Sequence, residues 1–287
     1  MRWQFHTDPV LDSHGAPVLN GRGLPDAPHL RGCGGVWSSA AVDAWHQQVI
    51  FGVADCNADA TSPYHESVLA LDLATGRFRW AFRPRETDRC DFDFGASSNI
   101  LHFGGTPYVG IGGKDDTYYV LRASPRTTAG ELLWSTRVVF GGRAGGFIGS
   151  TAYDGRRIYG GTGYGDGFDS PLCEPTDPRD QPLQDPSFHA FDVQTGTVVW
   201  QQPLSYTLGA AAVSAEVVLS GFAGLPPAAP PALRAYHTVS GQLLAEWPMP
   251  GAVHSSPTIV GRTTYFGTGN SFDGVGSAVH AWRLPVR

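Results

Sequence analysis

Residues 70–80 read ALDLATGRFRW, and residues 190–200 repeat the same pattern as AFDVQTGTVVW. The template that they share is A-x-D-x-x-T-G-x-x-x-W. Thr-Gly after an aspartate is typical of a tight turn between two strands, because glycine readily adopts the positive φ that such turns need. Side chains alternate along a strand, so the tryptophan projects to one face and can dock against a neighbouring sheet. The template therefore predicts a repeated β-hairpin.

Two weaker copies of the hairpin occur at residues 120–134 and 234–247, and each ends in a tryptophan. An apolar, alternating stretch lies upstream of each copy, as at residues 49–52 and 157–160. A repeating four-stranded unit that cannot bury both of its faces alone is typical of a β-propeller blade. A sandwich with coincidental hairpins would not match the template twice at all of its fixed positions. We therefore predict an all-β propeller of four-stranded antiparallel blades.

The tryptophan positions indicate about five blades, of which one is split between the two ends of the chain. We expect residues 1–287 to form one propeller domain, with a loop at 7–33 and loop insertions at 166–186 and 223–232. Residues 1–6 read as the last strand of a blade without its turn. Either they complete the last blade and close a small ring, or the chain is a stretch of a larger propeller.

The composition agrees with such a fold and excludes several others. Of 287 residues, 37 are glycine and 22 are proline, and only 16% are charged. These values exclude a coiled coil, a collagen and a disordered acidic chain, and they favour short strands joined by turns. A net charge of −6 gives no reason to expect a nucleic-acid partner. No apolar run reaches the roughly 18 residues of a transmembrane segment, and the polar residues 1–9 show no signal peptide.

A candidate site lies in the acidic segment that contains Asp88, Asp91 and Asp93. In a strand, Asp91 and Asp93 would share one face and lie close together. Two carboxylates in one concave site repel each other, which raises one pKa unless a cation lies between them. Oxygen ligands of this kind suit a hard cation such as Ca²⁺. The alternative is a solvated loop between blades.

Three segments give the chain a family resemblance, together with the tryptophan hairpin: residues 34–43, 88–95 and 112–121. The hairpin is similar to the tryptophan-docking repeat of quinoprotein dehydrogenases, which use pyrroloquinoline quinone (PQQ). The three segments resemble the alcohol dehydrogenase branch of that family, in particular polyvinyl alcohol dehydrogenase-like proteins. Members of the family have more blades than this chain. The blades without a counterpart here are N-terminal ones, which in the family supply a metal-binding glutamate and further cofactor contacts.

The resemblance implies roles for individual residues. Asp91 matches the catalytic base, and Asp93 matches an extra carboxylate that binds the metal in members that use a lanthanide. Trp37 matches the flat surface on which the quinone stacks, and Lys114, the only lysine, matches a cation beside the quinone oxygens. The alternatives are an ordinary docking tryptophan and a turn lysine. In Phe147-Ile148 the chain departs from an Asn-Trp pair that is common in the family.

Two further residues, Asp55 and Asn57, align with a segment near the metal of the family, so one of them is expected to supply another oxygen ligand. The implied cofactors are PQQ and Ca²⁺ or a lanthanide. The implied reaction is oxidation of an alcohol by hydride transfer to the metal-bound quinone, with Asp91 taking the hydroxyl proton. The alternative is a non-catalytic PQQ-like propeller that serves as a scaffold for a protein or a polymer. Hydrolysis of a glycoside by the paired carboxylates is a weaker third option.

The resemblance also implies a setting for the protein. The substrate would be a small-molecule or polymeric alcohol, the electron acceptor a cytochrome or a quinone, and the location secreted or periplasmic. The chain has four cysteines, Cys33, Cys56, Cys90 and Cys173. Because Cys56 and Cys90 adjoin Asp55 and Asp91, we expect a disulfide between them that pins the two acidic loops. The alternative pairs Cys33 with one of the two. Either bridge implies an oxidising compartment.

Overall fold

The computed structural model describes most of the chain, namely residues 2–25, 32–56, 62–85, 91–139, 145–163, 186–203, 206–224, 230–269 and 277–283. Asn57, Asp88, Cys90 and Cys173 lie outside these residues, as do most of the predicted loop 166–186 and the middle of the loop 223–232. The described residues form strands and turns without any helix, and therefore contain no helix that could span a membrane.

The strands form five antiparallel sheets, so the predicted all-β architecture of about five blades is confirmed. The first two sheets contain β1 (Ala41–Asp43), β2 (Gln48–Gly52), β3 (Val68–Asp72), β4 (Phe78–Phe82), β5 (Asn99–Phe103), β6 (Thr106–Gly112), β7 (Thr117–Arg122) and β8 (Leu132–Arg137). The third contains β9 (Ala152–Tyr153), β10 (Arg157–Gly161), β11 (Phe188–Asp192) and β12 (Val198–Gln202). The fourth contains β13 (Ala212–Ser214), β14 (Val217–Phe222), β15 (Ala232–His237) and β16 (Leu243–Pro248). The fifth contains β17 (Thr258–Val260), β18 (Thr263–Thr268) and β19 (Ala278–Arg283).

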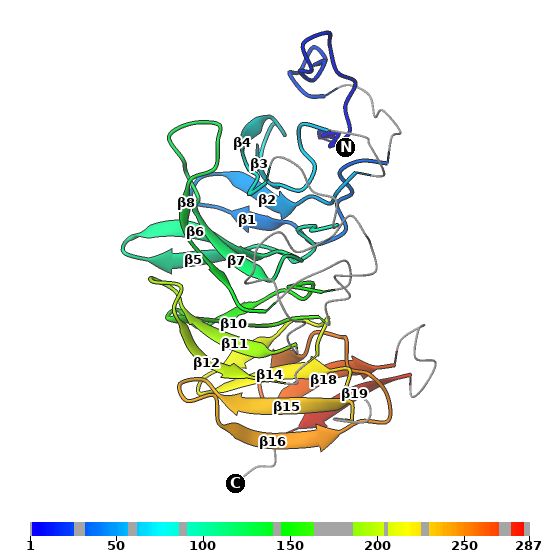
Figure 1. Cartoon of the computed structure of the whole chain (residues 1–287), viewed down its shortest axis with the longest axis vertical. Helices are drawn as coiled ribbons and strands as arrows, with labels where there is room; N and C mark the ends of the chain where they lie inside the picture. The colour runs from blue at the N-terminus through cyan, green and yellow to red at the C-terminus, as the bar shows by residue number, and fades with distance from the viewer. Residues whose placement is uncertain are drawn as a thin grey trace.

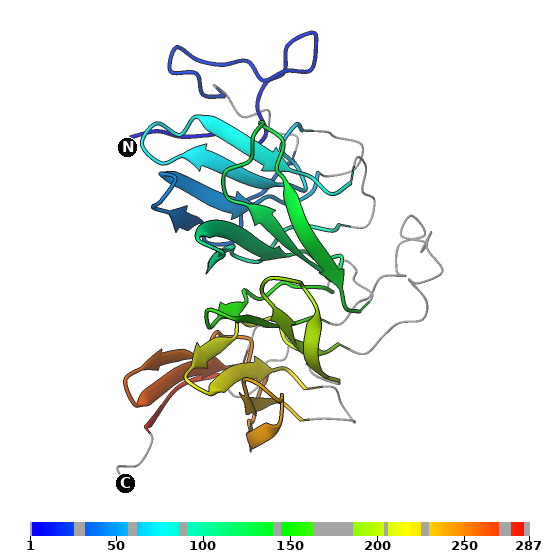
Figure 2. The ribbon, with the colours of Figure 1, turned by 90° about the vertical axis from the view of Figure 1, so that its left-hand side faces the viewer.

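Within each sheet the strands pair in chain order, and consecutive sheets meet through their first strands, in the order β1, β5, β9, β13 and β17. Figure 1 places the first sheet at one end of the molecule and the fourth and fifth sheets at the other. Figure 2 shows the sheets side by side along the long axis. In the part of the chain that the structure describes, four sheets have four strands, whereas the fifth has three, with β17 and β19 at its edges.

The Thr-Gly turn forms the β-hairpin that the template predicts. Asp72 Oδ1 accepts hydrogen bonds from the backbone N–H and the hydroxyl of Thr75, at 2.8 and 2.7 Å. Gly76 follows with φ 73°. In the second full copy, Asp192 and Thr195 repeat these bonds, and Gly196 has φ 72°. Aspartate, threonine and glycine thus close the hairpin from within.

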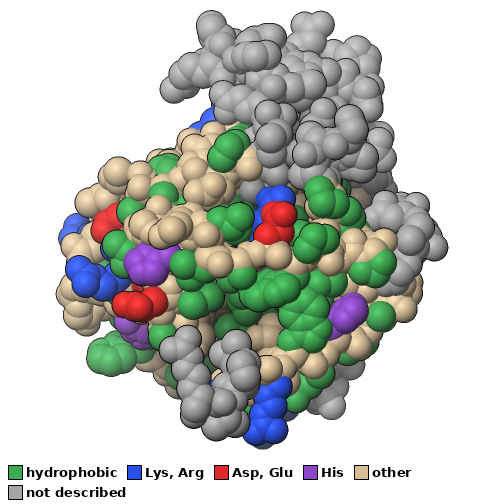
Figure 3. Space-filling model, turned by 90° about the horizontal axis from the view of Figure 1, so that it is seen from below, with side chains coloured by type: hydrophobic (Ala, Val, Ile, Leu, Met, Phe, Trp, Pro, Cys, Tyr) green, Lys and Arg blue, Asp and Glu red, His purple; other side chains and the backbone are tan. Residues whose placement is uncertain are grey.

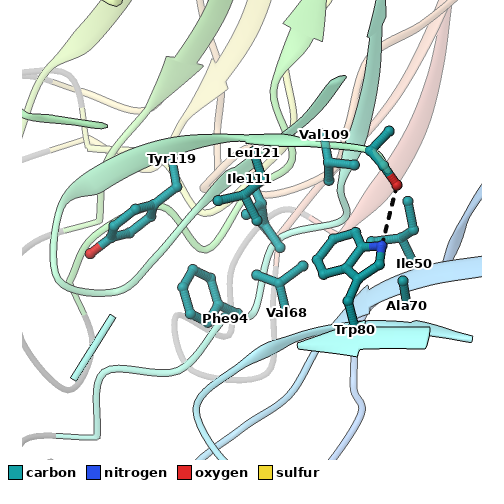
Figure 4. Packing of buried hydrophobic residues seen from close by; sticks show 11 residues of the cluster. Ile50, Val68, Ala70, Trp80, Phe94, Val109, Ile111, Tyr119 and Leu121 are labelled. Carbon is teal, nitrogen blue, oxygen red and sulfur yellow. Dashed lines mark hydrogen bonds between the residues drawn. The ribbon is translucent and has the colours of Figure 1, made fainter. Parts of the chain in front are cut away.

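The tryptophan of the hairpin connects its own sheet to the next one along the chain. Trp80 lies between the first two sheets, and its Nε1 donates to the Ala123 carbonyl at 3.2 Å (Figure 4). Trp200 repeats this arrangement with the Thr238 carbonyl at 2.9 Å. The ring also lies on a turn glycine of the next sheet, because a Cβ added to Gly241 would be 2.6 Å from Trp200 Cδ2. Each indole therefore contributes both buried apolar area and a hydrogen bond across the interface between sheets.

Residues near the N-terminus pack on the outer side of the first sheet. Trp3 Nε1 donates to the Leu73 carbonyl at 3.1 Å, and a Cβ added to Gly76 would be 2.5 Å from the Trp3 ring. Phe5 contacts Tyr64 with ring centroids 5.1 Å apart. Trp3 thus occupies on the first sheet the place that Trp200 occupies on the fourth. Among the described residues, 2–6 pair with no strand, and β18 is the strand with which β19 pairs.

Candidate functional site

The acidic residues converge at one end of the first two sheets. Asp55 follows β2, Asp91 and Asp93 precede β5, and Lys114 lies in the turn between β6 and β7. The backbone holds these segments together, because Lys114 N–H donates to the Asp93 carbonyl at 3.0 Å. The Asp55 N–H donates to Asp93 Oδ1 at 2.6 Å. Loops that are far apart in sequence thus bring three carboxylates and one ammonium group together.

Lys114 bridges two of the carboxylates. Its Nζ lies 2.6 Å from Asp91 Oδ1 and 2.9 Å from Asp93 Oδ2. The lysine side chain is only 7% exposed. Burial acts to lower the pKa of Lys114, but the negative charge of Asp93 and the hydrogen bonds to Asp91 and Asp93 outweigh burial and raise it. The ammonium group is therefore fully charged at neutral pH.

Asp91 has an unusual environment for a carboxylate. Burial raises its pKa to about 7, with a further contribution from the hydrogen bond to Asp93, and Lys114 offsets only part of this rise. Its backbone has φ 59°, a left-handed conformation that a non-glycine residue rarely adopts. A carboxyl group whose pKa lies near 7 can both accept and release a proton at neutral pH.

The three carboxylates can surround a cation. One oxygen from each of Asp55, Asp91 and Asp93 lies within 4.8 Å of the others. Among the described residues, Lys114 pairs with two of these carboxylates, and three carboxylates so close together suit a further cation. Carboxylate oxygens at this spacing suit a hard ion such as Ca²⁺. The residues present therefore fit the metal that the family resemblance implies. Asn57, the other predicted ligand, lies outside the described residues.

Trp37 lies beside this cluster. Its indole covers Gly95, because a Cβ added to Gly95 would be only 2.2 Å from Trp37 Cη2. Gly95 is two residues from Asp93, so the indole and the carboxylates border the same region. Trp37 is 51% exposed, whereas the docking residue Trp80 is 2% exposed. An exposed indole can stack against a planar ligand.

Sequence reasoning missed an ion pair next to the site. Arg85 Nη1 lies 2.7 Å from Asp115 Oδ2, and the Arg85 guanidinium lies over the Phe92 ring at 4.8 Å. Tyr119 also donates its hydroxyl hydrogen to Asp115 Oδ2 at 2.5 Å. Phe92 separates Asp91 from Asp93, so this ion pair supports the acidic segment from its other side. The sequence shows an arginine, Arg85, shortly before the acidic segment, but it gives no sign that this arginine contacts Phe92.

The predicted disulfide between Cys56 and Cys90 is wrong, because Cys56 is bonded to Cys33. The alternative pairing of Cys33 with Cys56 is the one that forms. Residues 33–35 run antiparallel to residues 54–56, with Gly34 N–H donating to the Asp55 carbonyl at 2.8 Å. This pairing sets the two cysteines opposite each other. The bridge therefore ties Asp55 to the segment that carries Trp37, rather than to the segment of Asp91.

Phe147, where the chain departs from the family, is fully buried between the second and third sheets. Its N–H donates to the Gly113 carbonyl at 3.0 Å. A Cβ added to Gly112 would be 2.2 Å from the Phe147 side chain. Phe147 thus holds the turn that carries Lys114 through its backbone, while its ring forms part of the core between the second and third sheets.

Comparison with known proteins agrees with this arrangement. The family model for the β-propeller domain of glucose, ethanol and other alcohol dehydrogenases, named for PQQ, matches residues 1–142. The predicted resemblance to the PQQ dehydrogenases is confirmed. The matched residues contain the whole candidate site, together with the first two sheets.

A curated relative and two solved structures support the same relationship. Polyvinylalcohol dehydrogenase of Sphingopyxis sp. (strain 113P3) is 23% identical over 188 residues, which are 58% of this chain and 27% of that protein. The quinohemoprotein alcohol dehydrogenase of Comamonas testosteroni aligns with a TM-score of 0.63 at 16% identity, over 89% of this chain and 50% of that one. A europium-containing methanol dehydrogenase aligns with a TM-score of 0.60 at 15% identity, over 92% and 58%. The chain thus spans about a quarter of the curated relative, and the two structures share its propeller fold.

Proposed function

We propose that this protein is an oxidoreductase that oxidises an alcohol with PQQ and a bound metal ion. The observation that carries the proposal is the convergence of Trp37 with the Asp55, Asp91, Asp93 and Lys114 cluster. A propeller alone would not support it, because the fold hosts many activities. A scaffold protein has no need to gather three carboxylates, a buried lysine and an exposed indole in one place.

The chain offers a contact for each part of the cofactor. Trp37 provides a flat surface for a planar ring system, and Asp55 and Asp93 provide oxygen ligands for Ca²⁺ or a lanthanide. Lys114 would supply a positive charge that stabilises the negative charge developed when a quinone is reduced. When bound, PQQ supplies the two-electron acceptor that no amino-acid side chain provides.

Asp91 is the residue that we assign to proton transfer. An alcohol loses one proton and one hydride on oxidation, and a carboxylate at the site can accept the hydroxyl proton. The pKa of about 7 suits this task near neutral pH. Lys114, at 2.6 Å, holds the carboxylate in place and stabilises its charged form. The proton then leaves to solvent, since the Asp91 side chain is 29% exposed.

The disulfide supports a proposal for location. Cys33 and Cys56 join the segment that carries Trp37 to the segment that carries Asp55, and such bridges persist in oxidising compartments. We infer a periplasmic or secreted protein that acts on a small or polymeric alcohol and passes electrons to a cytochrome or a quinone.

Titration of the purified protein with PQQ and either Ca²⁺ or La³⁺ tests the proposal. We expect quenched tryptophan fluorescence and a protein-bound quinone absorbance at micromolar cofactor. Asp91→Asn should then abolish dye-linked alcohol oxidation but retain cofactor binding, whereas Asp12→Asn, in an exposed turn near the N-terminus, should change neither. Absence of binding, or an active Asp91→Asn protein, would contradict the proposal, and absence of binding would favour the scaffold.

A further inference from the structure

Arg85 and Asp115 form an ion pair that joins the two sheets of the candidate site. Arg85 follows β4 in the first sheet, whereas Asp115 lies beside Lys114 in the β6–β7 turn of the second sheet. Arg85 Nη1 and Asp115 Oδ2 are 2.7 Å apart, and the two side chains are 26% and 10% exposed. The pair therefore connects the first sheet to the turn that carries Lys114.

Arg85 also contacts the acidic segment. Its guanidinium lies 4.8 Å from the centre of the Phe92 ring, and Phe92 stands between Asp91 and Asp93 in the chain. Lys114 contacts the same two aspartates, at 2.6 and 2.9 Å. The acidic segment is thus held by two cations, one on its carboxylates and one on its aromatic ring.

Asp115 is fixed by further hydrogen bonds. Its Oδ2 accepts the hydroxyl hydrogen of the buried Tyr119 at 2.5 Å, and its Oδ1 accepts the Thr117 N–H at 3.3 Å. A buried carboxylate that loses its cation still bears the cost of burial, which favours movement of its segment toward water. Loss of Arg85 is therefore expected to displace the turn that carries Lys114.

The fourth sheet contains the same kinds of contact, but there they are local. Arg234 Nε lies 2.6 Å from Glu246 Oε2, and the Arg234 guanidinium lies 4.8 Å from the centre of the Phe222 ring. These three residues belong to β15, β16 and β14, which are neighbouring strands of one sheet. Figure 3 looks onto this end of the molecule, where apolar side chains gather around a hollow, far from the first sheet in Figure 1. Arg85 differs because its contacts join separate connecting segments of two sheets.

We propose that Arg85 is a positioning residue that fixes Lys114 against the acidic segment. Asp115 transmits its effect to the turn of the lysine, and Phe92 transmits it to the aspartates. This role deepens the proposed function and rests on it, because a displaced ammonium group would no longer stabilise the charge of Asp91 or of a reduced quinone. The contacts themselves involve neither cofactor nor metal, so they can be tested without either.

Acetylation of Lys114 tests this role in the protein without cofactor. Lys114 is the only lysine, so mass spectrometry of one peptide measures its rate of acetylation by an N-hydroxysuccinimide ester. We expect this rate to rise about tenfold or more in Arg85→Gln, because the ammonium group loses charge-assisted hydrogen bonds when the turn moves. Arg85→Lys keeps the charge and should restore most of the protection. Arg234→Gln, which breaks the matching contacts in the fourth sheet, should react at the wild-type rate.

The affinity for Tb³⁺ is a second readout, and its direction separates positioning from charge. Removal of a positive charge near carboxylates would by itself raise their affinity for a cation. We expect the opposite in Arg85→Gln, a fall of about tenfold, because the carboxylates lose the contacts that orient them. Phe92→Leu changes no charge and should lower the affinity in the same direction.

Several results would overturn the proposal. One is an equal rate of Lys114 acetylation in Arg85→Gln and the wild type, and another is a higher affinity of Arg85→Gln for Tb³⁺. An equal increase of the acetylation rate in Arg234→Gln would also overturn it, because the effect would then come from a general loss of stability. If Arg85→Gln fails to fold, Tyr119→Phe decides: it removes one hydrogen bond to Asp115 and should speed acetylation about threefold, and an unchanged rate would overturn the proposal.

Failure of the wild type to bind PQQ has a different meaning. That result would contradict the proposed function, whereas the acetylation rates concern the contacts of Arg85 alone. The two proposals can therefore fail separately.

Discussion

The two end sheets of the molecule have opposite surroundings. The outer face of the first sheet is covered by residues near the N-terminus, and Trp3 docks there as a tryptophan from a preceding sheet would. The outer face of the fifth sheet presents Val260, Tyr265 and Val279, which are 61%, 43% and 86% exposed. Both faces of such a sheet are apolar, so its stability depends on what lies against each face. The comparison predicts that the docking tryptophans contribute strongly to how firmly each sheet is held.

The largest loss of stability is expected at an interface between two interior sheets, the third and the fourth. Trp200→Ala removes an indole that is 8% exposed and its 2.9 Å hydrogen bond to the Thr238 carbonyl. We expect the free energy of unfolding to fall by about 3–5 kcal/mol, the usual cost of removing a buried aromatic ring. Urea denaturation followed by circular dichroism measures this. A loss below about 1 kcal/mol would show that the interfaces do not depend on the indoles.

The docking of Trp3 on the first sheet can be tested at the turn glycine that it covers, Gly76. Gly76→Ala adds a Cβ that would lie 2.5 Å from Trp3, at φ 73°. We expect a loss of about 2–3 kcal/mol from left-handed strain and displacement of Trp3. The matched control is Gly261→Ala in the β17–β18 turn, with φ 58° and nothing within 4 Å of its added Cβ. The control should lose only about 1–2 kcal/mol, from strain alone. Equal losses in the two variants would mean that Trp3 is not held against Gly76.

The pH dependence of stability can be compared between a histidine in an interior sheet, His189, and one in an end sheet, His280. His189 in β11 is fully buried, and burial lowers its pKa to about 3. The unfolded chain binds a proton at this histidine below about pH 6.5, and the folded chain does not. Stability should therefore fall as the pH drops from about 6.5 to 3, by at most about 1.4 kcal/mol per pH unit. His189→Gln should reduce this slope, whereas His280→Gln in β19 should retain it. The same slope in wild type and His189→Gln would contradict the assignment.

The smallest effect is expected at the interface between the fourth and fifth sheets. Trp247→Ala removes an indole that is already 38% exposed and packs edge-to-face with Trp282. We expect a loss of about 1–2 kcal/mol, smaller than that of Trp200→Ala, because more of this indole is already in water. Thermal or urea unfolding beside Trp200→Ala measures the difference. A loss as large as that of Trp200→Ala would show that this interface is as closely packed as the others.

Much of the fold could be predicted from the sequence because the hairpin is a local structure. Asp72 and Thr75 close the turn with hydrogen bonds to each other, and Gly76 supplies the positive φ. The residues of the pattern therefore form the turn without contacts from elsewhere in the chain. The docking of Trp3 on Gly76 could not be predicted, because it joins segments about seventy residues apart. Residues 1–6 have the pattern of a strand, but nothing in that pattern specifies which sheet they contact.

The candidate site was predictable in part. The resemblance named Trp37, Asp91, Asp93, Asp55 and Lys114, and the structure brings these five residues together, while their roles stay predictions. The disulfide was mispredicted because proximity in sequence to Asp55 and Asp91 does not set which cysteines face each other. The backbone pairing of residues 33–35 with 54–56 determines which cysteines face each other. No local sequence pattern indicates that pairing.

Terbium luminescence tests most directly whether Trp37 and the carboxylates form one site. Tb³⁺ bound by Asp55 and Asp93 would lie next to the Trp37 indole, which can sensitise its emission. We expect saturable emission on excitation of tryptophan, an affinity reduced about tenfold or more by Asp93→Asn, and loss of most of the emission in Trp37→Phe with the affinity retained. Emission that does not saturate, or that persists unchanged in Trp37→Phe, would contradict the account.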